Sequence, residues 1–157
     1  LAPFRQEVIF RKDDFLIIND SASTSPEAGI AALQRFFPEA KRRGVPFLFI
    51  AGGTDKGLSY KGWAEEVLRC APDFLFLLEG SATDKMRRYI DISTYRHANV
   101  LACQDLEIII KDVKKKVDEA GGGVVVFSPS AASFEKFKNE FDRGEQFNLL
   151  AKKYLVV

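Results

Sequence analysis

The chain has 157 residues, of which 46% are apolar and 12% aromatic, which is enough for the core of one domain spanning residues 1–157. Its 23 basic and 22 acidic side chains nearly cancel, so we expect neither nucleic acid nor an anionic membrane surface as a partner. No apolar stretch is long enough to span a membrane and no secretion signal opens the chain, which predicts a cytoplasmic protein. The first residue is Leu1 rather than Met, which suggests a piece of a longer protein.

Short apolar runs alternate along the chain with longer stretches of helical periodicity, a pattern typical of a parallel sheet with crossover helices. Strands are predicted at residues 15–18, 46–51, 73–78, 99–103 and 123–127, with an edge strand or hairpin at 8–10. Helices are predicted at residues 26–43, 61–70, 83–89, 106–117 and 134–154. The expected fold is α/β, with a Rossmann-like, open, mostly parallel sheet of about five to six strands and helices on both faces.

The chain contains two cysteines and one histidine. Cys70 and Cys103 sit in apolar surroundings, and neither they nor His97 show the spacing of metal ligands. We therefore expect two reduced core cysteines and no metal-binding residues.

Ligands of open α/β sheets bind beyond the carboxyl ends of the strands, so the loop after each strand carries the functional information. The first loop reads NDSASTSPE, residues 19–27, where Ser25 before Pro26 is typical of a helix N-cap. The remaining polar residues allow two interpretations, a plain polar loop or a nucleotide or anion site at the helix N-terminus. In the second interpretation Asp20 would bind a ribose hydroxyl or a metal.

The second and last loops add a lysine and further hydroxyl groups. The second reads GGTDKG, residues 52–57, where paired glycines allow close approach of the backbone and Lys56 offers a charge to a carboxylate or phosphate. A glycine-rich turn with a solvated lysine is the alternative. The last loop reads SPSAASF, residues 128–134, and predicts Ser133 as the N-cap of the final helix.

The final helix is expected to place Phe134, Phe137 and Phe141 on one face, as part of the core. Together the three loops bring a lysine, hydroxyl groups and a helix N-terminus to one edge of the sheet. They contain no histidine, cysteine or carboxylate pair for acid–base or nucleophilic chemistry. The sequence therefore predicts a site that holds an anion.

The loop motifs together resemble the C-terminal domain of the Mur ligases, the ATP-dependent amide-forming enzymes of peptidoglycan precursor synthesis. The matching words are NDS at 19–21 with Thr24, GGTDKG at 52–57, SP at 128–129, ASF at 132–134, FKN at 137–139 and RG at 143–144, in family order across nearly the whole chain. The resemblance implies a three-domain enzyme whose N-terminal UDP-binding domain and central ATPase domain are absent from this chain. It is strongest to the glutamate-adding branch, because the Asp-Asn-Pro-Arg word of the diaminopimelate- or lysine-adding branch is missing.

The implied reaction uses ATP, with Mg²⁺, to phosphorylate the carboxylate of UDP-N-acetylmuramoyl-L-alanine, and D-glutamate then attacks the acyl phosphate. Carried over by motif, Thr24, Lys56, Ser133 and the Phe134 backbone would hold the carboxylates of D-glutamate. Arg5 and Asp20 would reach the phosphate and nucleotide of ATP. The domain alone is expected to be inactive and to bind no cofactor by itself.

The chain departs from the family pattern at three places. Ala22 stands where a lysine is usual, Phe4 replaces a histidine before Arg5, and Glu140 and Phe141 exchange the usual order of an aromatic and an acidic residue. Three alternatives remain open: a Mur-type ligase for another amino acid, a stand-alone Rossmann-like module that binds an acidic metabolite or nucleotide, and a structural interaction domain.

Overall fold

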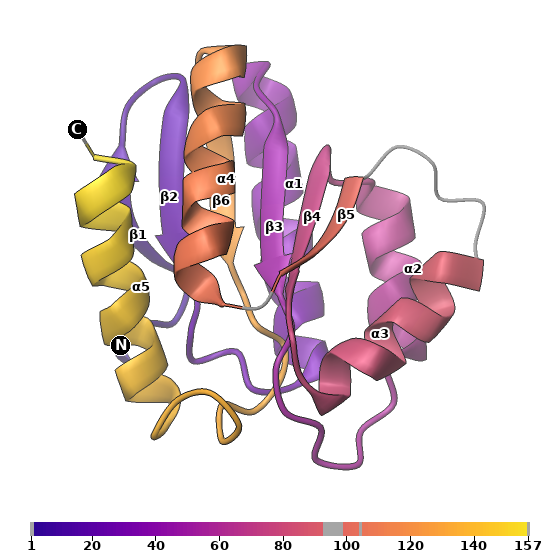
Figure 1. Ribbon diagram of the computed structural model, residues 1–157. Coiled ribbons are helices and arrows are strands. Elements are labelled where there is room, and N and C mark those ends of the chain that lie inside the picture. The colour runs from indigo at the N-terminus through magenta and orange to yellow at the C-terminus, as the bar shows by residue number, and fades with distance from the viewer. Residues whose placement is uncertain (1, 93–98, 104, 157) are drawn as a thin grey trace.

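Five of the apolar runs become parallel neighbours in one six-stranded sheet with the order β1-β2-β6-β3-β4-β5 (Figure 1). The computed structural model describes residues 2–92, 99–103 and 105–156. The strands are β1 (Glu7–Arg11), β2 (Phe15–Asn19), β3 (Phe47–Ala51), β4 (Phe74–Leu78), β5 (Asn99–Cys103) and β6 (Gly123–Phe127). The predicted fold class is confirmed, and the run at 8–10 lies in an edge strand, because β1 is at the end of the sheet order and pairs antiparallel with β2.

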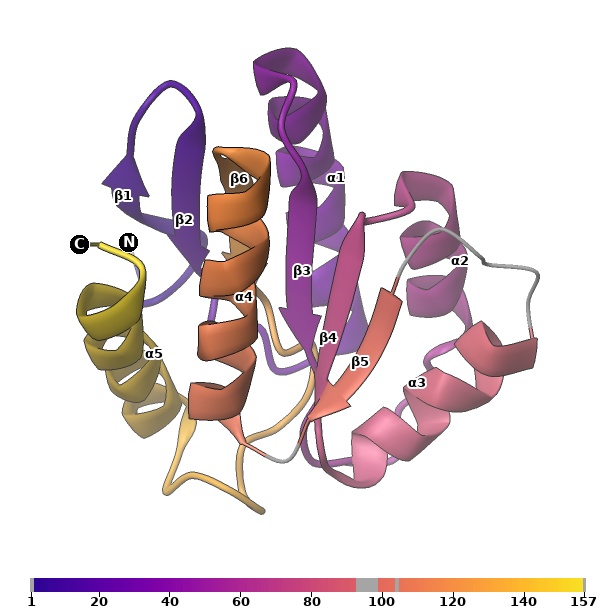
Figure 2. The same cartoon turned by 45° about the horizontal axis from the view of Figure 1, so that its top comes forward.

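Helices cover both faces of the sheet (Figures 1 and 2). The helices are α1 (Pro26–Arg43), α2 (Lys61–Cys70), α3 (Ser81–Ile92), α4 (Leu106–Ala120) and α5 (Glu140–Tyr154). Side chains of α1, α2 and α3 share one core with alternate residues of the strands, and those of α4 and α5 share the other. Along β3, Phe47 and Phe49 enter the first core while Leu48 and Ile50 enter the second, as the two-residue period of a strand requires.

The parallel strands all end at one edge of the sheet, the lower edge in Figure 1, where the loops after β2, β3 and β6 gather. This edge is formed by the segments in which the sequence predicts a ligand site. Among the described residues, no helix is long and apolar enough to cross a membrane.

The predicted start of the last helix is wrong by six residues. Helix α5 begins at Glu140, and its N-cap is Asn139, whose Oδ1 accepts the Asp142 N–H at 2.8 Å. Residues 134–139 form turns instead, because the Glu135 N–H donates to Thr54 Oγ1 at 3.0 Å in the neighbouring loop. Ser133 is therefore not a helix cap.

The predicted phenylalanine stripe is wrong for the same reason. Phe134 and Phe137 precede the helix that was to align them with Phe141. Phe134 is 72% exposed and Phe141 48% exposed, and only Phe137 packs against the core shared with α4 and α5.

The position of the cap can be tested by mutation. Asn139→Ala is expected to lower the free energy of unfolding by about 1 kcal/mol, because the Asp142 N–H loses its acceptor. Chemical denaturation measures this loss, with exposed Lys138→Ala as the control. Equal stability of the two variants would contradict the assignment of the cap.

Candidate functional site

The loop after β2 is anchored to α5 by the buried side chain of Asn19. Its Nδ2 donates to the Gly144 carbonyl at 2.9 Å and to Asn148 Oδ1 at 2.7 Å. Its Oδ1 accepts the Ser21 N–H at 3.0 Å. A single amide therefore holds the end of the strand, the loop and the helix in one arrangement.

Asp20 is the next residue and is only 1% exposed. Its Oδ1 accepts the Gln6 N–H at 2.9 Å and its Oδ2 accepts the Ser128 hydroxyl at 2.7 Å. Burial raises the pKa of Asp20 to about 6, although these hydrogen bonds and the charges of Arg5 and Arg143 act to lower it. Both carboxylate oxygens are thus engaged by the chain itself, while the Arg5 side chain is exposed.

The raised pKa makes a prediction about stability and pH. A carboxyl group whose pKa rises on folding stabilises the fold below its unfolded value of 3.8, and this contribution is lost as the pH rises through about 6. Asp20→Asn should remove that loss. As the pH rises from about 4 to about 8, the free energy of unfolding of the variant should therefore increase by about 2–3 kcal/mol relative to that of the unsubstituted protein.

Denaturation curves at several pH values measure this gain. Asp118→Asn is the control, because Asp118 is an exposed carboxylate paired with Lys114 on α4. If the difference between the Asp20 variant and the unsubstituted protein did not change with pH, the raised pKa would be wrong.

Arg143 joins the loop after β2 to the loop after β6. The side chain is 1% exposed, and its Nε and Nη2 donate to Ser21 Oγ at 3.1 Å and the Ser21 carbonyl at 2.7 Å. Its Nη2 also reaches the Ser23 carbonyl at 3.4 Å, and its Nη1 donates to the Ala131 carbonyl at 2.9 Å. Burial lowers the pKa of Arg143 to about 10, so the side chain stays charged at neutral pH.

In the sequence, Arg143 belongs to one of the matching words but has no predicted role. A signal was present, since Arg143, Phe147 and Ala151 recur every four residues and all three are buried on α5. A cation on the apolar stripe of a helix indicates a buried polar network rather than a solvated side chain.

Ser130 is a second junction in the loop after β6. Its backbone has a φ of 62°, and its carbonyl accepts the Tyr60 hydroxyl at 2.7 Å. Its Oγ accepts the Trp63 Nε1–H at 3.0 Å, and its N–H donates to Ser23 Oγ at 3.2 Å. The small residues of this loop thus pack against buried aromatic side chains of the segment around the start of α2.

The loop after β3 pairs with the same loop. The Thr54 N–H donates to the Ala132 carbonyl at 2.9 Å, and the Ala132 N–H donates to the Thr54 carbonyl at 3.2 Å. Gly53 has a φ of 152°, and a Cβ there would lie 2.6 Å from the Ala132 carbonyl oxygen. The close approach of these two loops therefore requires glycine at this position.

The residues predicted to bind D-glutamate all lie at this edge of the sheet. Ser133 is 4% exposed, Thr24 is half-buried, and Lys56 and Phe134 are exposed. Ser133 lines a small cavity of about 10 Å³ next to the paired loops, and the described residues around that cavity include neither Thr24 nor Lys56. This volume suits a water molecule and is too small for an amino acid.

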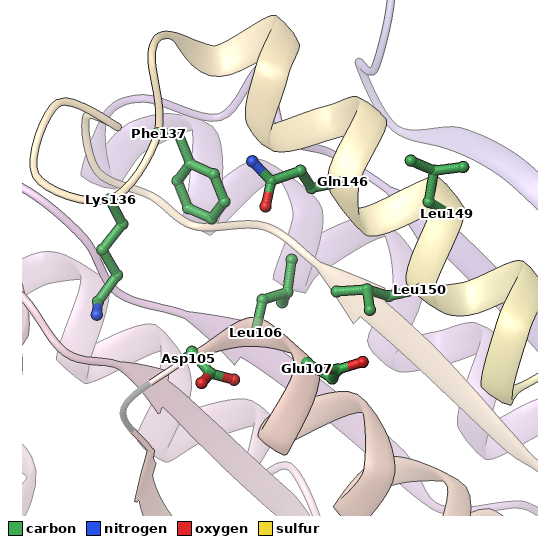
Figure 3. Close-up of a pocket in the computed structure, with 8 residues that line it drawn as sticks. All are labelled: Asp105, Leu106, Glu107, Lys136, Phe137, Gln146, Leu149 and Leu150. Atoms are coloured by element: carbon green, nitrogen blue, oxygen red, sulfur yellow. The ribbon is translucent and has the colours of Figure 1, made fainter.

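A larger cavity of about 440 Å³ opens between the start of α4 and α5 (Figure 3). Its lining residues are Asp105, Leu106, Glu107, Lys136, Phe137, Gln146, Leu149 and Leu150. Polar groups at its rim are already engaged, because Asp105 caps α4 and Glu107 accepts the Tyr154 hydroxyl at 2.8 Å. None of the predicted site residues lines this cavity.

Cys70 is a buried free thiol, as expected, and burial raises its pKa to about 12. His97 and the side chain of Cys103 lie outside the described residues. Within the described part of the chain, no group of three or more His, Cys, Asp and Glu residues is placed to hold a metal ion.

Both the fold and the sequence of the chain are similar to those of known ligases. A solved structure of UDP-N-acetylmuramoyl-L-alanyl-D-glutamate–2,6-diaminopimelate ligase superimposes on 81% of this chain and 26% of its own, with a TM-score of 0.53 and 18% identity, which shows a shared fold. No family model matches the chain. In sequence, the chain is a homologue of one segment of the Mur ligases, which confirms the resemblance noted above.

The relatives are named for glutamate addition. UDP-N-acetylmuramoylalanine–D-glutamate ligase of Treponema pallidum is 36% identical over 143 residues, which cover 91% of this chain and 24% of the relative. UDP-N-acetylmuramoyl-L-alanine–L-glutamate ligase of Xanthomonas axonopodis is 30% identical over 95% of this chain and 30% of the relative. The chain spans about a quarter to a third of the length of these relatives.

Proposed function

We propose that the chain is the C-terminal domain of an ATP-dependent ligase that adds D-glutamate to UDP-N-acetylmuramoyl-L-alanine through an acyl phosphate. The observation that carries the proposal is the homology to ligases of this name over 91% or more of the chain. The remaining domains, for UDP binding and ATP hydrolysis, would precede this segment. The enzyme would act in the cytoplasm, in peptidoglycan synthesis for cell wall growth and division.

In this proposal the domain holds the carboxylates of D-glutamate with Thr24, Lys56, Ser133 and the Phe134 backbone. The hydrogen bonds of Arg143 support the arrangement, because they link the loop that carries Thr24 to the loop that carries Ser133. The pairing of Thr54 with Ala132 brings the loop of Lys56 to the same place. Since Lys56 is exposed, the site would be completed when this domain closes on the rest of the enzyme.

On the nucleotide side, Arg5 is exposed and fits an ATP phosphate, whereas Asp20 is buried with both oxygens engaged. We assign Asp20 to the nucleotide side of the site, where its hydrogen bonds to Gln6 and Ser128 hold the neighbouring segments in place. The described residues form no metal cluster, so Mg²⁺ would be held with ATP by the remaining domains. The isolated chain would then be inactive.

The test is phosphate release by the full-length protein with ATP, Mg²⁺ and UDP-N-acetylmuramoyl-L-alanine. D-Glutamate, L-glutamate, L-lysine and diaminopimelate are compared as acceptors, and release that depends on D-glutamate alone is expected. Release with L-glutamate would make the chain functionally similar to the Xanthomonas relative, and release with another amino acid would keep the family but change the branch. No release with any acceptor would favour a stand-alone binding module.

A further inference from the structure

The segment that precedes β1 is docked on the candidate site. We call residues 4–6 the N-terminal strap. The Phe4 carbonyl accepts the Ala22 N–H at 2.9 Å, and the Gln6 N–H donates to Asp20 Oδ1 at 2.9 Å. The Gln6 side chain accepts a hydrogen bond from Arg35 Nη1 at 2.7 Å. The strap is thus tied to the loop after β2 and to α1.

The Phe4 ring packs against Gly144 in α5. A Cβ at Gly144 would lie 2.4 Å from Phe4 Cδ2 and 2.5 Å from Phe4 Cγ, distances at which the ring must move. Glycine is less favourable than alanine inside a helix, so its presence here requires another reason. The contact with the Phe4 ring supplies that reason.

The backbone of the strap depends on these contacts. Phe4 has a φ of 58° and Gln6 a φ of 45°, in the left-handed region that residues with side chains rarely adopt. Such a conformation persists only where the surroundings hold it. Loss of the contact between the Phe4 ring and Gly144, or of the hydrogen bond to Asp20, should therefore release the strap.

Arg5 lies between the two anchored residues, and Asp20 also accepts the Ser128 hydroxyl at the start of the loop that carries Ser133. We propose that Asp20 and Gly144 dock the N-terminal strap and thereby position Arg5 at the carboxyl edge of the sheet. This proposal rests on the proposed function for the role of Arg5 toward ATP, and on contacts within the chain for the docking itself. Asp20 is then a positioning residue that acts through Arg5.

Hydrogen exchange tests the docking in the full-length protein. Gly144→Ala is expected to speed exchange of the Gln6 and Ala22 amides by about tenfold or more, because both lose their acceptors when the ring is displaced. In a Phe4→Ala background the same substitution should change exchange less than about twofold, since the clash is gone.

Gly62→Ala is the matched control. Gly62 also lies in a helix, and the nearest atom to an added Cβ is Ile30 Cδ1 at 4.0 Å. Unchanged exchange in Gly144→Ala would overturn the docking. Equal acceleration in both Phe4 backgrounds would also overturn it, because the effect would then come from α5 alone.

Kinetics test the positioning of Arg5. Gly144→Ala and Asp20→Ala should each raise the KM for ATP by about tenfold, like Arg5→Ala, with the KM for glutamate within about twofold. In an Arg5→Ala background they should add nothing. Additive losses, or an equal rise in the KM for glutamate, would overturn the positioning role. Absence of ligase activity in the unsubstituted protein would contradict the proposed function, while exchange would still decide the docking.

Discussion

Replacement of Arg143 by methionine is expected to lower the free energy of unfolding by about 3 kcal/mol. The guanidinium supplies hydrogen bonds to the carbonyls of Ser21, Ser23 and Ala131 and to the Ser21 hydroxyl. Without it these buried acceptors lose their donors, and each such loss costs about 1–3 kcal/mol. Relief from burying a charge offsets part of this cost, which is why the sum is not larger.

Chemical denaturation measures the loss, with Arg42→Met as the control because Arg42 is an exposed arginine on α1. Arg143→Lys should remain destabilised, since an ammonium group lacks the planar fork that reaches several acceptors at once. The role of Arg143 would be contradicted if Arg143→Met were as stable as Arg42→Met. A destabilised protein with unchanged glutamate kinetics would separate the structural role from any effect on the binding loops.

Lys56→Ala is expected to weaken the use of glutamate by roughly ten- to a hundred-fold. A charge-assisted hydrogen bond to a carboxylate is worth roughly 1.5–3 kcal/mol, and each 1.4 kcal/mol is about a factor of ten in affinity. The side chain is exposed, so the fold should keep its stability. The ratio kcat/KM for D-glutamate in the full-length protein measures the effect.

Lys61→Ala is the matched control, because Lys61 is an exposed lysine a few residues further along at the start of α2. An effect of Lys56→Ala within about twofold would remove Lys56 from the site. Ser133→Ala is a useful companion, since Ser133 is not the helix cap and its substitution leaves the Asn139 cap in place. A loss in both variants, without a loss of stability, would support a shared carboxylate site.

The fold class follows from the amino-acid sequence alone, because buried parallel strands leave a strong pattern of apolar runs. The runs FLFIA of β3 and GVVVF of β6 are apolar throughout, since both faces of the sheet are covered by helices. The resemblance to the Mur ligases was also visible at this level, because the loop words occur in family order along the chain, and the Treponema relative is 36% identical over 91% of it. Local rules identified Ser25 as the cap of α1, where its side chain accepts the Ala28 N–H.

The construction of the loops, in contrast, depends on contacts between segments that are distant in the chain. Ser133 and Asn139 both suit a helix cap by residue type. The hydrogen bond from the Glu135 N–H to Thr54 Oγ1 links two loops, and the helix begins only after it, with Asn139 as the cap. Asp20 reads as a ligand group in sequence, yet folding engages it with Ser128, 108 residues away. Such contacts depend on which strands become neighbours, and local propensity carries no information about partners distant in the chain. Burial requires polar groups to find hydrogen-bond partners within the fold, wherever in the sequence those partners lie.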